Sequence, residues 1–261
     1  MRPELFHIGG ITLYSYGFFI LLGMIAAFLH LYFNRVRLGM DVDSISELIL
    51  WCGVGVFVGG KLFFFLEDPV GYWNNLSHFL THLGDGFVFY GSFLLTLPLL
   101  YWWFKKKGWD FWDRMDDVGV AGARVHAIGK IGCLMAGCCH GLVCKPGEWG
   151  IVFRDPKSHA EPLGEALYPV QLWDSGIILL SIAIMYWVLH RGKQFSGQVF
   201  LVYALVYGVG RYVTEAYRGD GERGFLFDGL LSHSQFIAIL VVVGSLLLYV
   251  YLKKRGLKDA L

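Results

Sequence analysis

The chain alternates long apolar runs with short polar connections. Seven of the runs are close to the roughly 20 residues that an α-helix needs to cross a bilayer. They cover residues 12–34, 47–66, 87–104, 117–138, 168–190, 198–217 and 230–252. The fourth run is the least apolar, because it contains Arg124, His126, Lys130 and several glycines. The pattern predicts an all-α polytopic membrane protein with seven transmembrane helices.

The basic residues of the connections indicate which side of the membrane each connection faces. If all seven runs cross, one set of connections holds twelve Lys and Arg residues and the other set holds six. Cytoplasmic connections carry the excess of Lys and Arg in membrane proteins. The distribution therefore predicts an N-terminus outside and a cytoplasmic C-terminus. It also supports the fourth run as a span, because the pattern is scrambled without it.

The composition is typical of a membrane protein and excludes one class of partner. The chain is 56% hydrophobic and 16% charged, which is more apolar than a soluble domain can cover with polar surface. The net charge is +1, so no basic field indicates a nucleic-acid partner. No repeat or linker divides the chain. We therefore expect one transmembrane domain, residues 1–261, with a small polar head on the outer face at 142–167.

Polar residues gather at the predicted outer ends of the helices. Arg211, Glu215 and Arg218 follow the i, i+4, i+7 spacing of one helix face. Charged groups within a span cost a few kcal/mol and usually face a polar cavity, so the sequence predicts a shared outer cavity. The candidate residues for it are Tyr16, Lys61, Tyr90, Lys130, Gln171, Arg211, Glu215 and Arg218.

A structural role stays open for several of these residues. Arg211 and Glu215 can form an ion pair within one helix, which holds the bundle together without binding a ligand. The long side chain of Arg218 can reach the membrane interface. Tyr16 and Tyr90 can be interfacial aromatic anchors.

The stretch GKIGCLMAGCCHG, residues 129–141, places reactive side chains at the outer end of the fourth helix. The N and S ligands of this region are Cys133, Cys138, Cys139, His140 and Cys144. Their spacing is not a recognised zinc framework, and adjacent cysteines rarely serve one tetrahedral ion. We therefore expect neither a metal nor another cofactor. Two thiol chemistries remain open: a disulfide from Cys144 to one of the adjacent cysteines, and a nucleophilic thiol activated by Lys130 or His140.

Seven segments, in order along the chain, resemble the motifs of one family. They are YSYGFF (14–19), VGGKLFFFL (58–66), GDGFVFYGS (84–92), GKIGCLMAGCCHG (129–141), YPVQLWD (168–174), GRYVTEAYRGD (210–220) and LSHSQ (231–235). Together they resemble the prolipoprotein diacylglyceryl transferases, which are seven-helix enzymes of the bacterial inner membrane. The fourth segment stands where that family has the signature G-R-I-G-N-F-I-N-G-E-x-x-G.

The resemblance implies an activity and a place for it. Enzymes of this family move diacylglycerol from phosphatidylglycerol to the thiol of a lipobox cysteine in a lipoprotein precursor, and glycerol phosphate is released. The active site is then expected on the periplasmic or outer side, with Lys130 and Arg211 as ligands of the phosphate. The resemblance, taken with the thiol chemistry above, gives as expected catalytic residues Tyr90, Lys130, Cys138, Cys139, His140 and Arg211. The expected substrate-binding residues are Tyr16, Lys61, Cys133, Gln171, Glu215 and Arg218.

The chain departs from the family pattern at residues that carry chemistry. Lys130 replaces an arginine, Cys133 and Ala136 replace two asparagines, Cys138 replaces a glutamate, and Tyr90 replaces a histidine. These changes indicate a divergent branch, in which Cys138 or Cys139 could carry a covalent lipid or acyl group. Two other functions stay open: a membrane thiol oxidoreductase that uses Cys138 and Cys139, and a phospholipid-binding or transport protein without catalysis.

Overall fold

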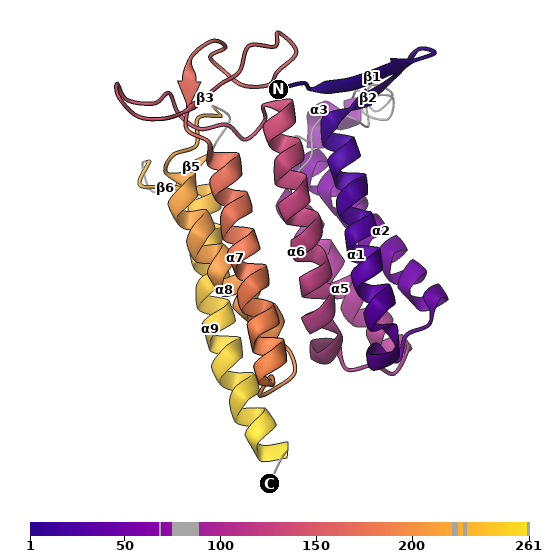
Figure 1. The fold of residues 1–261 in the computed structure, drawn as a ribbon. Coiled ribbons are helices and arrows are strands. Elements are labelled where there is room, and N and C mark those ends of the chain that lie inside the picture. Colours follow the sequence, from indigo (N-terminus) through magenta and orange to yellow (C-terminus); the bar gives the residue numbers. More distant parts are fainter. Residues whose placement is uncertain (68, 75–88, 221–223, 227–228, 260–261) are drawn as a thin grey trace. The chain divides into compact units, whose positions relative to one another are not determined.

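The computed structural model describes residues 1–67, 69–74, 89–220, 224–226 and 229–259. Within these ranges, every long helix lies on one of the seven apolar runs. The helices are α1 (Ser15–Leu38), α2 (Val42–Glu67), α5 (Phe89–Lys106), α6 (Phe111–Ala136), α7 (Val170–Arg191), α8 (Gln198–Glu215) and α9 (His233–Asp259), with a short α3 (Pro69–Asn74). The predicted helices are therefore confirmed as helices (Figure 1).

Five helices of the described chain, α1, α2, α6, α7 and α9, are long and apolar enough to cross a membrane. The least apolar of the predicted spans is among them, since α6 reaches a mean hydropathy of 1.2. Half of its most apolar stretch is buried within the protein, a larger share than in the other four helices. Its charged residues Asp116, Asp117 and Lys130 are buried within the protein, which is the arrangement that charges within a membrane span require.

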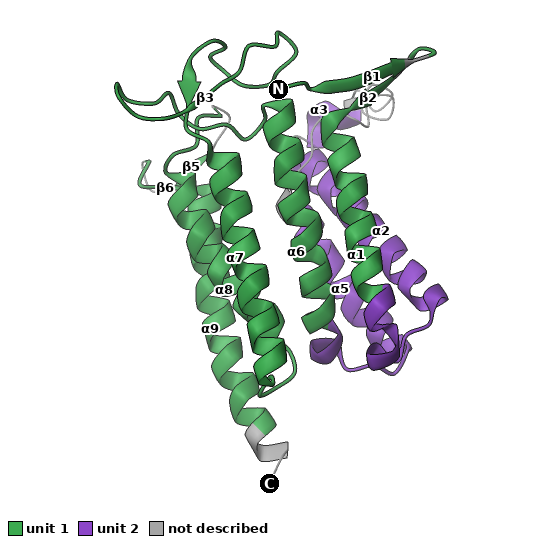
Figure 2. Ribbon diagram, viewed as in Figure 1, with its two compact units in different colours: residues 1–31, 115–261 green, residues 32–114 purple. Residues whose placement is uncertain are grey.

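The chain folds into two compact units, residues 32–114 and residues 1–31 with 115–261 (Figure 2). In the smaller unit, α2 packs against α5 through glycines. An added Cβ at Gly59 would collide with the backbone of Gly91, and one at Gly55 would lie 2.8 Å from Cα of Thr96. Small residues allow this close approach of helix backbones in membranes.

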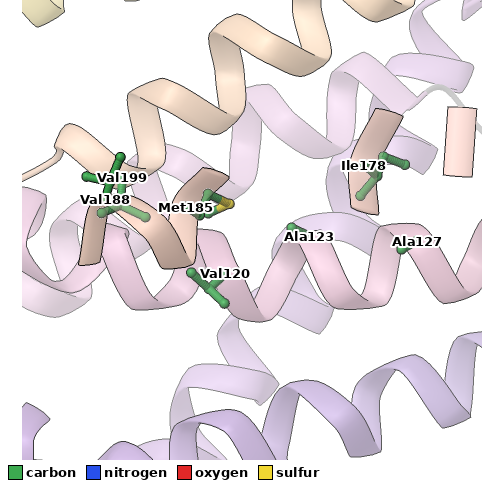
Figure 3. Packing of buried hydrophobic residues seen from close by; sticks show 7 residues of the cluster. All are labelled: Val120, Ala123, Ala127, Ile178, Met185, Val188 and Val199. Carbon is green, nitrogen blue, oxygen red and sulfur yellow. The ribbon is translucent and has the colours of Figure 1, made fainter. Parts of the chain in front are cut away.

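The larger unit contains α1, α6, α7, α8 and α9. Its core is a cluster between α6, α7 and α8, shown in Figure 3. The buried residues of the cluster are Val120, Ala123, Ala127, Ile178, Met185, Val188 and Val199. On α6 these are small side chains at helical spacing, so α7 can approach closely, and on α7 they are larger side chains that fill the space.

A polar network fixes the start of α8. Asp116 of α6 is fully buried, and its carboxylate accepts hydrogen bonds from the backbone N–H groups of Gly197, Val199 and Phe200 at 2.9 to 3.0 Å. Lys193 lies 3.3 Å from the same carboxylate. The N–H groups of a first helical turn have no partner within the helix, so Asp116 acts as a cap supplied by another helix.

The small β-hairpins of the larger unit lie at one end of its helices (Figure 1). They are formed by β1 (Glu4–Ile8) with β2 (Ile11–Tyr14), β3 (Ile151–Val152) with β4 (Ala166–Leu167), and β5 (Phe225–Leu226) with β6 (Leu231–Ser232). The C-terminal end of α9 lies at the opposite end of this unit.

The polar segment 142–167 folds as a small head at the β-hairpin end. It contains its own apolar cluster of Ile151, Phe153, Ala160 and Leu167. An ion pair of 2.5 Å between Lys157 and Glu4 connects the head to β1.

The cap on α8 generates a prediction about stability. Replacement of Asp116 by Ala leaves several buried backbone donors without an acceptor, and each such donor costs about 1–3 kcal/mol. We expect Asp116→Ala to lower the free energy of unfolding by about 3 kcal/mol or more, measured in mild detergent by Trp fluorescence. The control Asp113→Ala removes a half-exposed carboxylate of the same helix and should cost less than about 1 kcal/mol. Equal effects of the two variants would contradict the cap.

Candidate active site

The site forms around the chain reversal that follows α6. Gly137 and Cys139 both have left-handed backbone conformations, with φ of 81° and 58°. The Gly137 N–H closes the helix end by donating to the Cys133 carbonyl at 2.9 Å. A Cβ at position 137 would collide with the side chain of Ser158, so the close contact with the head requires glycine here. The reversal folds the adjacent cysteines back toward the last turn of α6.

Three thiols meet at this reversal. The Sγ atoms of Cys133, Cys138 and Cys139 all lie within 4.8 Å of one another. All five cysteines of the chain are free thiols, so the disulfide considered for Cys144 is not formed in this structure. The Cys144 thiol instead donates to the Trp149 carbonyl at 3.5 Å within the head.

The thiols after the helix end differ in acidity. Hydrogen bonds from Cys133 and Cys138 hold the pKa of the Cys139 thiol well below its ordinary value, and the positive charges of Arg218 and Lys130 act in the same direction. The pKa of Cys138 is raised, because hydrogen bonding to the other two sulfurs and burial favour its neutral thiol. Of these two thiols, Cys139 is therefore the more acidic.

His140 supports the loop through its ring nitrogens. Its Nδ1 lies 3.0 Å from the Gly141 carbonyl, and its Nε2 accepts a hydrogen bond from the Glu161 N–H at 3.3 Å. The side chain is buried. With both nitrogens used by backbone groups, this ring holds the loop in the described conformation, and a catalytic role for His140 stays a prediction.

A buried ion pair joins α6 to α7. Lys130 Nζ donates to Asp174 Oδ2 at 2.6 Å, and both side chains are nearly inaccessible. The Thr214 hydroxyl of α8 donates to the other oxygen of Asp174 at 2.7 Å. One guanidinium nitrogen of Arg211 lies 3.5 Å from Asp174 Oδ2. Asp174 is thus the carboxylate around which both expected phosphate ligands are arranged.

Arg211 also pairs within its own helix. Its Nη2 lies 2.7 Å from Glu215 Oε2, which is the intrahelical pair expected from the spacing. The Ser232 hydroxyl donates to Glu215 Oε1 at 3.1 Å, and this contact links α8 to the start of α9. The Arg211 Nη1 is buried and makes no hydrogen bond to any residue in the described ranges.

Arg218 lies where the chain leaves α8. It forms a two-pronged ion pair with Asp220, and its backbone bridges to Gly141 in an antiparallel arrangement. The Leu142 N–H donates to the Tyr217 carbonyl at 2.8 Å. The segments that follow α6 and α8 are therefore held side by side, and Arg218 lies near enough to Cys139 to influence its charge.

The larger unit collects most of the expected site residues. Gln171 donates to the Cys138 carbonyl at 2.9 Å. The Tyr16 backbone packs on Gly132, where an added Cβ would lie 3.3 Å from Tyr16 Cα. The residues brought together here are Tyr16, Lys130, Cys133, Cys138, Cys139, Gln171, Arg211, Glu215 and Arg218.

Two expected residues are not placed in this site. Lys61 belongs to the smaller unit, is buried, and has its ammonium 5.4 Å from the centre of the Phe64 ring. Tyr90 lies in the first turn of α5, but its side chain falls outside the described part of the structure. Their roles at the substrate stay predictions.

Three residues that the structure adds to the site are absent from the expected list: Asp174, which pairs with the cations, and Thr214 and Ser232, which donate to the carboxylates of Asp174 and Glu215. Asp174 could have been predicted from the sequence, because it is an isolated carboxylate in the apolar run that follows Gln171. A buried carboxylate in a span needs a cation as partner, and Lys130 lies at the same predicted depth. Thr214 and Ser232 carry no such signal in the sequence.

The buried ion pair leads to a prediction about coupling. Asp174→Asn keeps the shape but leaves the Lys130 charge uncompensated, and we expect a loss of about 3–5 kcal/mol in the free energy of unfolding. The double variant Lys130→Gln, Asp174→Asn replaces the pair by two neutral amides and should recover a large part of that loss. The measurement is denaturant unfolding in mild detergent.

Glu165→Gln is the matched control, because Glu165 is an exposed carboxylate of the head. It should change stability by no more than about 0.5 kcal/mol. The single variant Lys130→Gln completes the cycle, and losses of the two single variants that simply add in the double variant would show that Lys130 and Asp174 are not energetically coupled.

Comparisons with known proteins find relatives along nearly the whole chain. A family model described as prolipoprotein diacylglyceryl transferase matches residues 3–251. A phosphatidylglycerol–prolipoprotein diacylglyceryl transferase of Clostridium tetani is 34% identical over 243 residues, 93% of this chain and 94% of that protein. A protein of Clostridium perfringens, named phosphatidylglycerol–prolipoprotein diacylglyceryl transferase 2, is 32% identical over 259 residues, 99% of this chain and 98% of that protein. The chain therefore belongs to the prolipoprotein diacylglyceryl transferase family.

Proposed function

We propose that this protein transfers a diacylglyceryl group from phosphatidylglycerol to the thiol of a prolipoprotein. The family match along nearly the whole chain carries the proposal. Two relatives that cover at least 93% of the chain bear the name of this activity. These names support the transferase over the thiol oxidoreductase and over the phospholipid-binding protein without catalysis.

The proposed setting is a bacterial inner membrane, with the site on the periplasmic or outer side. Five helices suited to a membrane support the first part. The twelve-to-six distribution of Lys and Arg supports seven spans, an outer N-terminus and a cytoplasmic C-terminus. In that topology, residues 1–261 form one transmembrane domain, with the head and the thiol loop at the outer face.

The proposed phosphate ligands are Lys130 and Arg211. Both are basic, nearly buried, and fixed by Asp174, so they keep their positions before the substrate arrives. A lysine ammonium has three N–H donors. Lys130 uses one of its donors for the hydrogen bond to Asp174. The buried Nη1 of Arg211 makes no hydrogen bond within the described chain. This Nη1 lies 3.5 Å from Asp174 Oδ2 as an ion pair, and an anionic phosphate at this point would give it a hydrogen-bond acceptor.

The same cations assist the reaction. When the acceptor thiol attacks the glyceryl carbon, the bond from that carbon to the phosphate oxygen breaks, and glycerol phosphate leaves with the electron pair. Negative charge therefore grows on the phosphate oxygens in the transition state, where fixed cations stabilise it more than in the ground state. Asp174 and Glu215 keep the cations oriented, and Arg218 adds positive charge beside the thiol loop.

Removal of the proposed phosphate ligands gives a test of activity. Each charge-assisted contact is worth about 1.5–3 kcal/mol, so Lys130→Ala and Arg211→Ala should each lower the transfer rate at least about tenfold. The assay follows transfer of labelled diacylglycerol from phosphatidylglycerol vesicles to a lipobox peptide. Arg154→Ala is the control, because Arg154 is an exposed cation of the head. Unchanged rates in both site variants, with the protein folded, would mean that these charges are structural.

The topology has a separate test. Reporters of membrane side, fused after Trp109 between α5 and α6 and after Trp149 in the head, should report the cytoplasm and the outside respectively. The physical reason is that α6 alone separates these two points. The same side for both reporters would show that α6 does not cross, and the proposed location of the site would then be wrong.

A further inference from the structure

The three thiols of Cys133, Cys138 and Cys139 form a geometry that the sequence spacing does not suggest. Zinc–sulfur bonds of about 2.3 Å in a tetrahedron place ligand sulfurs about 3.8 Å apart. The three Sγ atoms already lie within 4.8 Å of one another. Side-chain adjustments of about an ångström or less therefore bring all three to one ion.

The backbone explains how adjacent cysteines can share this point. Cys139 has a φ of 58°, a conformation that costs a non-glycine residue about 1–2 kcal/mol. The strain is held by hydrogen bonds around the loop, from Gln171 to the Cys138 carbonyl and from the Gly219 N–H to the His140 carbonyl. The left-handed turn lets Cys138 and Cys139 direct their sulfurs to the same side as Cys133. Held strain of this kind is found at ligand-binding sites.

The donor set suits zinc and leaves one position open. Thiolates select Zn²⁺ among the common divalent ions. Within the described residues, the group of convergent ligand atoms consists of these three sulfurs. His140 uses both ring nitrogens elsewhere, and Cys144 bonds within the head. Zinc with three protein ligands and one exchangeable position is the arrangement of catalytic sites, whereas structural sites have four protein ligands.

The surrounding charges fit the same occupant. Three thiolates and one Zn²⁺ carry a net charge of −1. Arg218 and Lys130 are the cations that interact electrostatically with Cys139. Each of these cations also faces a carboxylate, Asp220 for Arg218 and Asp174 for Lys130, so they offset part of a charge that is otherwise costly at the edge of a membrane.

A covalent role for these cysteines is chemically less suitable. A diacylglyceryl group on Cys138 or Cys139 would be held by a thioether to an sp³ carbon. Passing it on would require a thiolate to leave that carbon, which is a much poorer leaving group than a phosphate ester. The lipid would therefore remain on the enzyme after the first turnover.

We infer that Cys133, Cys138 and Cys139 bind one Zn²⁺, whose fourth position takes the thiol of the lipid acceptor. This inference rests on the proposed transferase function. A metal-bound thiol is deprotonated, and its proton passes to solvent. The bound sulfur then attacks the glyceryl carbon of phosphatidylglycerol, a C–S bond forms, the C–O bond to the phosphate breaks, and glycerol phosphate leaves. Zinc and all sulfur atoms keep their oxidation states.

Metal content is the first measurement. The full chain, purified in detergent with a tag that binds no metal, should contain about one zinc per chain when its metal content is measured by elemental mass spectrometry. Cys133→Ser, Cys138→Ser and Cys139→Ser should each weaken zinc binding at least about tenfold, since even changes beyond the ligands cost that much. Cys52→Ser and Cys144→Ser are matched controls and should retain zinc. A protein that neither contains zinc nor binds it on titration would overturn the inference, as would a disulfide among the three cysteines.

The open position is tested with cobalt in place of zinc. Co²⁺ bound to the wild-type thiols gives sulfur-to-metal charge-transfer absorption. A lipobox peptide with its cysteine should add to this absorption, while the same peptide with serine should leave it unchanged. No response to the cysteine peptide would mean that the acceptor thiol does not bind the metal.

Removal of zinc from the wild-type protein avoids the question of whether the variants fold. Chelation should lower transfer from phosphatidylglycerol at least about tenfold, and added Zn²⁺ should restore it. Full transfer by zinc-free protein would overturn the inference and leave the proposed transferase intact. Zinc and cysteine-peptide binding without any transfer from phosphatidylglycerol would instead overturn the proposed function, and with it the reaction step at the metal.

Discussion

The ion pair between Lys130 and Asp174 is the interaction on which the rest of the larger unit depends. Two opposite charges buried in a membrane protein are stable only when each is paired and its remaining hydrogen-bonding capacity is used. Lys130 comes from α6 and Asp174 from α7, while Thr214 and Arg211 of α8 complete the surroundings of the carboxylate. One buried carboxylate thereby fixes three helices at the same depth. The consequence is that α6 can be the least apolar of the five candidate spans and still be the most buried of them.

The same pairing shapes the chemistry available at the site. Each cation expected to bind phosphate already has a carboxylate beside it, so the apo site carries little net charge. This costs some attraction for an anion, but it keeps the cations rigid, and preorganised charges need no rearrangement when negative charge develops during reaction. The thiol loop is attached to this frame by Gln171, which lies one helical turn before Asp174 and donates to the Cys138 carbonyl. The cations and the thiols are therefore positioned by the same turn of α7.

The helices could be predicted from the sequence because apolar runs of this length have few alternatives in a bilayer. Their ends were less predictable. The apolar pattern predicts a fourth run that begins at 117, whereas α6 begins at Phe111, because Asp110 caps a polar first turn by accepting from the Asp113 N–H at 2.8 Å. The spacing of Arg211, Glu215 and Arg218 placed the cations on α8, but pairing between helices, such as that of Lys130 with Asp174, leaves no periodic pattern. The spacing of the cysteines in the sequence also could not predict that the three thiols converge, because their convergence depends on left-handed backbone at Gly137 and Cys139.

The convergence of the three thiols offers a physical reason why several residues of this chain differ from the family signature together. Cys133 and Cys138 stand where the signature has an asparagine and a glutamate, and in a straight helix residues five apart would not share a face. The reversal after Ala136 brings them together with Cys139, so a change at one position alters the surroundings of the other two. Replacing one hydrogen-bonding side chain by a thiol would leave the remaining polar groups poorly matched. Replacing them as a set produces a soft donor cluster with a chemistry of its own, while Lys130, which replaces the arginine of the signature, still provides the cation that pairs with Asp174.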